Sequence, residues 1–243
     1  MKTLILLHGW GANGAVWARQ FRAFQNRLQV LAPDIPVWDP AWLGDYLDHF
    51  SLPDCLLVGW SLGGMQLLEV LARQTAAPGS LVLAGVPPVF CSRPDHPWGQ
   101  PPAAVRAMRL GLKKNPRKVL QDFALTCLGP GEENDQNEVA ALFTGGNGSD
   151  LAAGLDCLLN QDLRPLLSQL PVAPVIIQGD QDRIVSPEQA RFLQEHLPGS
   201  SLRLLPGAGH MPFVTQAEIF NGILAGIIGE KAPRSVISKN YED

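Results

Sequence analysis

Six short apolar segments recur along the chain, and residues typical of turns follow each of them. They cover residues 3–7, 29–32, 55–58, 81–84, 175–178 and 202–205. Apolar positions with helical spacing lie between them, in residues 16–27, 42–50, 63–73, 188–197 and 218–228. Uninterrupted apolarity is typical of strands buried on both faces. The alternation therefore predicts an α/β fold with about six mainly parallel strands and helices on both faces of the sheet.

The alternation stops between residues 88 and 162, where Pro, Gly and Asn punctuate helical segments. An unstructured loop of this length would be unusual in a compact domain, so we expect three or four short helices that form a cap over the carboxyl edge of the sheet, inserted after the fourth strand. Asn115 and Pro116 are typical of a helix start. The predicted organisation is a core of 1–87 and 163–229, a cap of 88–162, and a polar tail of 230–243.

Composition narrows the class of protein. The 243 residues are 46% hydrophobic with a net charge of −4, which fits a globular domain with a substantial core and disfavours a nucleic-acid binder. Cys55, Cys91, Cys127 and Cys157 form no Cys-x-x-Cys pair, so we expect free thiols in a reducing compartment. No apolar run is long enough for a signal peptide or a membrane span. We therefore expect a cytoplasmic protein with no membrane or nucleic-acid partner, and we expect a monomer.

A Gly-x-Ser-x-Gly sequence follows the third predicted strand and leads into a predicted helix. It reads Gly59-Trp60-Ser61-Leu62-Gly63. Flanking glycines leave room for a sharp turn that lifts the serine hydroxyl into the cleft beyond the strand. The alternative explanation is a glycine-lined turn with a capping serine. The strand-to-helix position favours a nucleophile at Ser61.

A serine hydroxyl needs a base to act as a nucleophile, and the base needs an acid to orient it. Asp182 follows the fifth predicted strand, and His210 follows the sixth. Since the carboxyl ends of parallel strands meet at one edge of a sheet, both side chains are expected near Ser61. The order Ser, Asp, His along the chain is one in which catalytic triads occur.

Other residues compete for these two roles. Asp180 is an alternative acid, although the Gly-x-x-Asp spacing favours Asp182. Three of the five histidines have no strand-end setting, namely His49, His96 and His196. His8 does follow a strand, but we expect it to shape the loop after that strand.

Acyl transfer also needs two backbone donors for the oxyanion and a pocket for the acyl chain. The expected donors are the N–H groups of Trp10 and Leu62. The side chains of Trp10 and Trp60 would then lie at the floor of the substrate pocket, and composition adds Leu112, Phe123 and Phe143 of the cap as substrate contacts. Ordinary aromatic packing is the alternative role for the tryptophans.

A second motif points to a different class of protein. Gly9, Gly11 and Gly14 fit the Gly-x-Gly-x-x-Gly fingerprint after a strand, and Asp34 lies at the end of the next strand. That pattern is typical of NAD(P)- or FAD-binding oxidoreductases. It leaves Ser61, Asp182 and His210 unexplained, whereas a hydrolase uses the same glycines in its oxyanion loop.

The predicted cap is strongly polarised in charge. Its first part contains six basic residues and no acid between positions 106 and 118: Arg106, Arg109, Lys113, Lys114, Arg117 and Lys118. Residues 119–162 contain eight acidic residues and no Lys or Arg. The basic stretch is either a solvated helix facing its acidic neighbour or a docking surface for an acidic partner.

The sequence resembles the α/β-hydrolase superfamily, and within it most closely the pimeloyl-acyl-carrier-protein methyl ester esterases of biotin synthesis. The likeness lies in four blocks: residues 6–11 with Val16-Trp17, then 59–64, 182–185 and 209–213. It implies an α/β-hydrolase fold with Ser61, Asp182 and His210 as the triad and with Trp10 and Leu62 as oxyanion donors. Compared with the family, the chain lacks an N-terminal hairpin, so six strands are expected in place of eight.

The resemblance and the residues together imply a serine carboxylesterase that hydrolyses the methyl ester of a dicarboxylate bound to acyl-carrier protein. Neither a metal nor an organic cofactor is expected, and the basic cap stretch would meet the acidic carrier. The alternatives are a general small-ester or carbon–carbon bond hydrolase of the same fold, the oxidoreductase described above, and a non-catalytic ligand-binding protein of the hydrolase fold.

Overall fold

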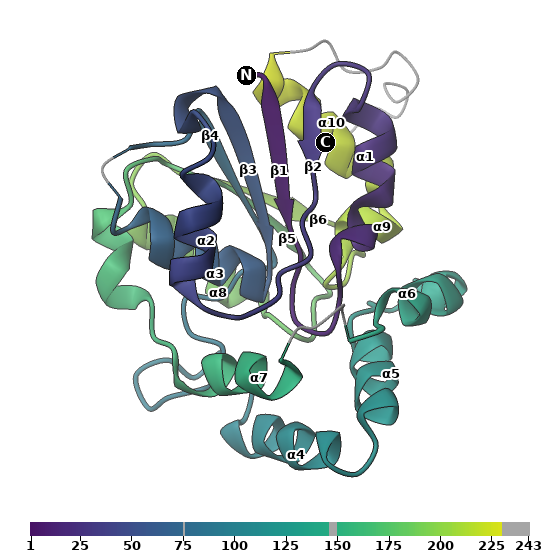
Figure 1. Cartoon of the computed structure of the whole chain (residues 1–243). Helices are drawn as coiled ribbons and strands as arrows, with labels where there is room; N and C mark the ends of the chain where they lie inside the picture. Colours follow the sequence, from purple (N-terminus) through teal and green to yellow (C-terminus); the bar gives the residue numbers. More distant parts are fainter. Residues whose placement is uncertain (75, 146–149, 230–243) are drawn as a thin grey trace, which may run out of the picture.

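The computed structural model describes residues 1–74, 76–145 and 150–229 (Figure 1). A single parallel sheet with strand order β2-β1-β3-β4-β5-β6 forms its centre. The strands are β1 (Thr3–Leu7), β2 (Gln29–Leu31), β3 (Cys55–Trp60), β4 (Ser80–Ala84), β5 (Val175–Gly179) and β6 (Ser201–Leu205). Each lies within two residues of its predicted position, so the predicted sheet is confirmed.

The central strands are fully covered, whereas the two edge strands are not. All side chains of β1 and β3 are buried. The prediction that every strand is buried on both faces is wrong for β2 and β6, where Gln29, Arg203 and Leu204 are exposed. An edge strand has a neighbour on one side only, so helices cover it less completely.

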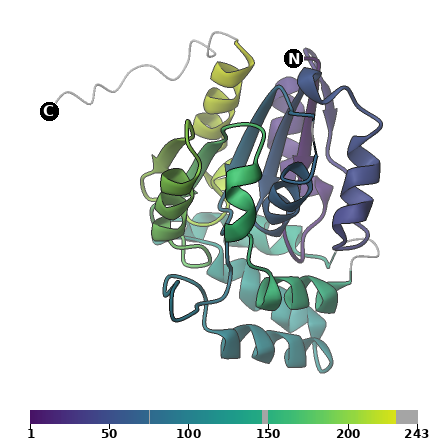
Figure 2. The same ribbon diagram turned by 90° about the vertical axis from the view of Figure 1, so that its left-hand side faces the viewer.

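Helices cover both faces of the sheet (Figures 1 and 2). One face carries α1 (Ala18–Phe24), α9 (Pro212–Thr215) and α10 (Ala217–Ile228), and the other carries α2 (Pro40–Leu47), α3 (Leu62–Leu71) and α8 (Pro187–His196). Short 3-10 helices are η1 (Gly14–Trp17), η2 (Leu52–Asp54) and η4 (Arg164–Gln169). The helix predicted at 16–27 is split between η1 and α1. α2 begins two residues earlier than predicted because Asp39 caps it and Pro40 takes its first position.

Between β4 and β5 the chain forms the cap helices α4 (Pro102–Leu112), α5 (Pro116–Thr126), α6 (Gln136–Leu142) and α7 (Leu151–Asn160), with the 3-10 helix η3 (Glu133–Asp135). They lie beyond the carboxyl ends of the strands, at the opposite end of the sheet from the N-terminus (Figure 1). Asn115 caps α5 through a bond from the Lys118 N–H, as its sequence predicts. The predicted tail at 230–243 lies outside the described residues.

β1 pairs with β2 on one side and with β3 on the other, so the chain changes the side on which it adds strands after β2. In open parallel sheets the carboxyl ends at such a reversal form a crevice for ligands. The loop after β1 and the turn after β3 meet at this point. None of the helices in the described ranges is long and apolar enough to span a bilayer.

Candidate active site

Ser61 occupies a strained turn between β3 and α3. Its φ is +52°, and it is the only non-glycine residue with a positive φ among the residues described. Glycines on both sides allow the turn, because a Cβ on Gly59 would lie 2.5 Å from the Cα of Gly64, and one on Gly63 would lie 2.2 Å from the carbonyl oxygen of His8. Such backbone strain costs about 1–3 kcal/mol and is concentrated at functional sites. The sequence motif therefore corresponds to a tight strand–turn–helix junction.

The loop after β1 packs directly against this turn. A Cβ on Gly9 would lie 3.1 Å from the Cβ of Ser61 and 3.1 Å from the ring of Trp60. In the described part of the chain, neither the Trp10 N–H nor the Leu62 N–H donates a hydrogen bond. Two unpaired backbone donors therefore flank Ser61, as an oxyanion site requires.

His210 and Asp182 form a buried pair at the ends of β6 and β5. Nδ1 of His210 lies 2.7 Å from Oδ2 of Asp182, and both side chains are completely buried. Asp182 Oδ1 accepts from the N–H groups of Ile184 at 2.8 Å and Val185 at 2.9 Å. An ionised carboxylate only accepts hydrogen bonds, so these contacts fit a charged Asp182 beside a histidine that is protonated at Nδ1.

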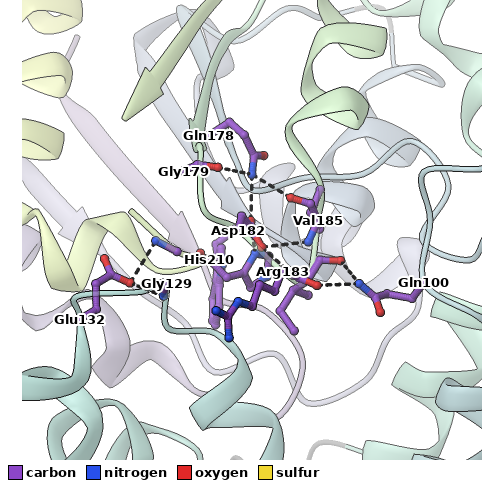
Figure 3. A network of polar contacts seen from close by, with 12 residues as sticks. Gln100, Gly129, Glu132, Gln178, Gly179, Asp182, Arg183, Val185 and His210 are labelled. Carbon is purple, nitrogen blue, oxygen red and sulfur yellow. Dashed lines mark hydrogen bonds and ion pairs between the residues drawn. The ribbon is translucent and has the colours of Figure 1, made fainter. Parts of the chain in front are cut away.

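Gln178 adds a further donor to this carboxylate, as Figure 3 shows. Its Nε2 lies 2.9 Å from Asp182 Oδ2, 2.9 Å from the Val185 carbonyl oxygen and 3.2 Å from the Gly179 carbonyl oxygen. Because all three neighbours are acceptors, the amide must direct its NH₂ group toward them. Gln178 was not identified from sequence, although a polar residue ending an apolar strand is the available signal.

Trp60, the residue before Ser61, contacts His210 on the side away from Asp182. The Trp60 Nε1 donates to the His210 carbonyl oxygen at 3.0 Å, and the two rings lie 5.4 Å apart. His210 Nε2 is buried and has no hydrogen-bond partner among the described groups, so it is not bonded to the Ser61 hydroxyl. Catalytic hydrogen bonds often tighten only when substrate binds.

Gly85, directly after β4, leaves room for His210. Its φ is +54°, and a Cβ there would lie 2.9 Å from His210 Nδ1. Gly85 was not among the site residues predicted from sequence, although a glycine directly after a buried strand is a signal for close approach. Thus four neighbouring strand ends contribute to one site.

The competing residues lie elsewhere. Asp180 accepts from the Gly207 N–H at 2.8 Å, so Asp182 is the carboxylate that contacts His210. His8 donates from Nδ1 to its neighbour Gly9 and accepts the Ile35 N–H at 2.9 Å, and burial lowers its pKa. His8 is therefore a neutral residue that holds the loop after β1.

Neighbouring residues of this chain occupy the space beside the three glycines of the Gly-x-Gly-x-x-Gly fingerprint. Substituents on Gly9, Gly11 and Gly14 would meet Ser61, Leu120 and the carbonyl of Ala32, respectively. The Gly14 N–H donates to Asp34 at 2.8 Å. These contacts favour an oxyanion loop over a dinucleotide-binding turn.

Four of the five residues predicted to contact substrate form one aromatic cluster. Trp10 packs on Phe123 with ring centroids 5.1 Å apart, Phe123 on Phe143 at 5.6 Å, and Phe143 on Trp60 at 6.2 Å. The Trp10 Nε1 donates to the carbonyl oxygen of Leu151 in α7. Cap residues thus close over the Ser61 turn.

Two cavities flank this cluster. One, of about 390 Å³, lies between α4 and α5 and is lined mainly by apolar side chains, including Phe90, Val105, Met108, Phe123 and Ile184. The other, of about 660 Å³, lies between α5 and α6 and includes Leu120, Phe143 and Arg117. Leu112 lines neither cavity, and its half-buried side chain packs against the hydrophobic core.

The six predicted docking cations do not form a uniform basic surface. Arg109 pairs with Asp156 of α7 at 2.9 Å, and Lys118 pairs with Asp122 at 2.9 Å. The remaining four have no ion pair within the described ranges and are exposed: Arg106, Lys113, Lys114 and Arg117. Acids of the same cap therefore neutralise part of the basic stretch.

The cysteines and other potential ligands suggest no further chemistry at this site. All four cysteines are free thiols, as predicted. Burial and the nearby Asp182 carboxylate raise the pKa of Cys127 well above its ordinary value, so this thiol stays protonated. Among the residues that the structure describes, no group of three or more His, Cys, Asp or Glu side chains could hold a metal ion.

Comparisons with known proteins place the chain in a family. A family model described as the alpha/beta hydrolase family matches residues 4–222. The pimeloyl-[acyl-carrier protein] methyl ester esterase of Chromobacterium violaceum is 31% identical over 235 residues, which cover 91% of this chain and 92% of that protein. The protein of the same name from Aeromonas salmonicida is 30% identical, with 93% and 95% covered.

Solved structures share the fold at lower identity. An esterase from Exiguobacterium antarcticum superposes with a TM-score of 0.85 at 23% identity, covering 95% of this chain and 92% of that one. A bromoperoxidase from Bacillus anthracis gives a TM-score of 0.82, also at 23% identity, with 94% and 92% covered.

Proposed function

The chain belongs to the alpha/beta hydrolase family, and on that premise we propose that it is a serine carboxylesterase that uses Ser61, His210 and Asp182. The observation that carries this proposal is the buried hydrogen bond between His210 and Asp182 beside the strained Ser61 turn. A positioned imidazole whose far nitrogen is free of partners is what a serine nucleophile needs as its base. The names of its relatives, which are esterases, support the same reaction class.

In the proposed mechanism, His210 Nε2 takes the proton of Ser61 as the hydroxyl oxygen attacks the ester carbonyl. The N–H groups of Trp10 and Leu62 hold the resulting oxyanion. His210 then protonates the leaving alcohol, which departs to leave an acyl-enzyme. His210 then takes a proton from a water molecule, whose oxygen attacks the acyl carbon. As the bond between the acyl carbon and the serine oxygen breaks, His210 returns this proton to Ser61 and the acid is released. Asp182 keeps the imidazole in the required tautomer and stabilises its charged form throughout.

The proposed substrate is a dicarboxylate methyl ester carried on acyl-carrier protein, in the cytoplasm and in biotin synthesis. The names of the relatives, which are pimeloyl-[acyl-carrier protein] methyl ester esterases, support it. The apolar cavity between α4 and α5 is a suitable place for the acyl chain, since its lining reaches Ile184, two residues after Asp182. The four exposed cations on α4, on α5 and in the turn between them are a suitable surface for an acidic carrier protein.

Genetic rescue tests the substrate most directly. The chain is expressed in a strain that lacks its own pimeloyl-ester esterase, and growth is scored without biotin. Rescue by the wild type and failure of Ser61→Ala at equal expression is the expected result. A well-expressed wild type that fails to rescue, yet hydrolyses simple esters, would overturn the biotin assignment and leave the esterase in place.

One observation favours a second candidate, a general small-ester hydrolase. Two of the six cations between positions 106 and 118 are already paired with acids, and the rest of the cap is rich in acids. This candidate predicts that free short-chain methyl esters have a kcat/KM as high as that of the carrier-bound ester. A clear preference for the carrier-bound ester would exclude it.

A further inference from the structure

Glu132 is a buried acid that the mechanism above does not use. It lies in the loop between α5 and η3, and only 7% of it is exposed. Its Oε2 accepts two backbone N–H groups, from Gly129 at 2.7 Å and from Gly209 at 3.0 Å. Gly129 belongs to the same loop as Glu132 (Figure 3), but Gly209 is the residue directly before His210 in the sequence.

A second hydrogen bond joins the same two loops. The His210 N–H donates to the carbonyl oxygen of Cys127 at 2.7 Å. Two consecutive N–H groups of the histidine loop are therefore held by the loop that follows α5. The two loops touch so closely that a Cβ on Gly209 would lie 2.4 Å from both the Cys127 carbonyl oxygen and the Gly129 nitrogen.

These contacts fix the backbone of His210 from the cap side, while Trp60 fixes its carbonyl oxygen from the nucleophile side. Neither oxygen of Glu132 bonds to the imidazole, and its Oε1 is buried without a partner among the described groups. Burying a carboxylate with one oxygen left without a hydrogen bond costs folding free energy. Packing alone therefore does not explain why an acid stands at position 132.

We propose that Glu132 is a positioning residue for His210, an inference that rests on the proposed serine esterase mechanism. Glu132 accepts the N–H of Gly129 in its own loop and the N–H of Gly209 in the histidine loop. It thereby holds the two loops together and sets the distance from the imidazole of His210 to Ser61. Misplacing a catalytic group by about 1 Å can cost on the order of 100-fold in rate. Glu132 therefore acts on the chemical step and not on ester binding.

The test compares Glu132→Ala, Glu132→Gln and the matched control Glu133→Ala in steady-state hydrolysis of p-nitrophenyl butyrate. Glu133 is adjacent and exposed, and it bonds only within its own loop, to the Gly131 N–H. The expected result is a fall in kcat of roughly 10- to 100-fold for Glu132→Ala with little change in KM. Glu132→Gln should recover most of kcat because an amide oxygen can accept both N–H groups, and Glu133→Ala should match the wild type.

A wild-type kcat in Glu132→Ala, a change confined to KM, or an equal loss in Glu132→Gln would each overturn the inference. If Glu132→Ala does not fold, Glu132→Asp replaces it, since the shorter side chain keeps the charge but cannot reach both N–H groups. A folded Glu132→Asp with wild-type kcat then contradicts the inference. Ester hydrolysis by the wild type that disappears in Ser61→Ala keeps the proposed function standing in every one of these cases.

Discussion

Gln178 illustrates how single side chains set the electrostatics of the proposed triad. Its NH₂ group donates to the same Asp182 oxygen that accepts from His210. We predict that Gln178→Leu lowers kcat by roughly 10-fold with little change in KM, because the carboxylate loses a donor that fixes its orientation. Steady-state kinetics measure this change, with Gln181→Leu as the control because Gln181 is exposed. Equal kinetics in both variants would argue against a positioning role for Gln178.

His8 makes a prediction about stability and pH. Burial lowers its pKa, so the folded protein holds it neutral while the unfolded chain protonates it near its ordinary value of 6.5. Below about pH 6.5 the unfolded state therefore binds more protons at His8 than the folded state does. The free energy of unfolding falls as the pH is lowered from there to the pKa of His8 in the folded protein. His8→Gln should reduce the loss in unfolding free energy between about pH 7.5 and pH 5.5, by up to about 1.4 kcal/mol per pH unit within the window. Urea unfolding at both pH values measures it; identical pH dependence in wild type and variant would contradict it.

At the scale of elements, Gly85 determines how closely the end of β4 approaches the histidine loop. We predict that Gly85→Ala lowers kcat by about 10-fold or more, because the new Cβ would lie 2.9 Å from His210 Nδ1 on a backbone with positive φ. The control is Gly222→Ala in α10, where a Cβ meets nothing within 4 Å and alanine favours the helix. Activity assays and thermal unfolding of both variants test this, and an active Gly85→Ala enzyme would show that the close approach is dispensable.

The α4–α5 pair makes a prediction about the carrier protein. Reversing Lys113 and Lys114 to Glu together should raise KM for a carrier-bound ester roughly 10-fold at low salt, because attraction to an acidic surface is lost. The KM for a small free ester should stay unchanged. The matched control is the double variant Arg22→Glu with Arg203→Glu, which lies on α1 and β6, outside the cap. Equal effects on both substrates, or from both double variants, would rule out docking at this surface.

For the molecule as a whole, periodicity and turn residues were enough to predict the sheet and its flanking helices. Strand ends were predictable because turn residues such as Gly, Asp and Ser follow the apolar runs. These strand ends place Ser61, Asp182 and His210 at one edge of the predicted sheet. Two strands were wrongly expected to be covered on both faces. Apolarity along a segment does not record whether a sheet continues beyond it.

Residues that act across long sequence distances could not be predicted in this way. Glu132 reaches the histidine loop from the cap, and Arg109 pairs with Asp156 across two helices. Local patterns carry no information on how the cap helices pack, so neither contact has a sequence signal beyond an acid in a glycine-rich turn. The same reason explains Leu112, which composition suggested for the pocket and which lines neither cavity described.

The central claim, that Ser61 is activated by His210 and Asp182, is tested most directly by labelling with a fluorophosphonate probe followed by peptide mass mapping. We predict a single adduct on Ser61, none in Ser61→Ala, and a labelling rate at least about 10³-fold lower in Asp182→Asn, with circular dichroism used to check that this variant is folded. An enzyme that hydrolyses esters but carries the adduct on another residue, or reacts equally fast as Asp182→Asn, would contradict it.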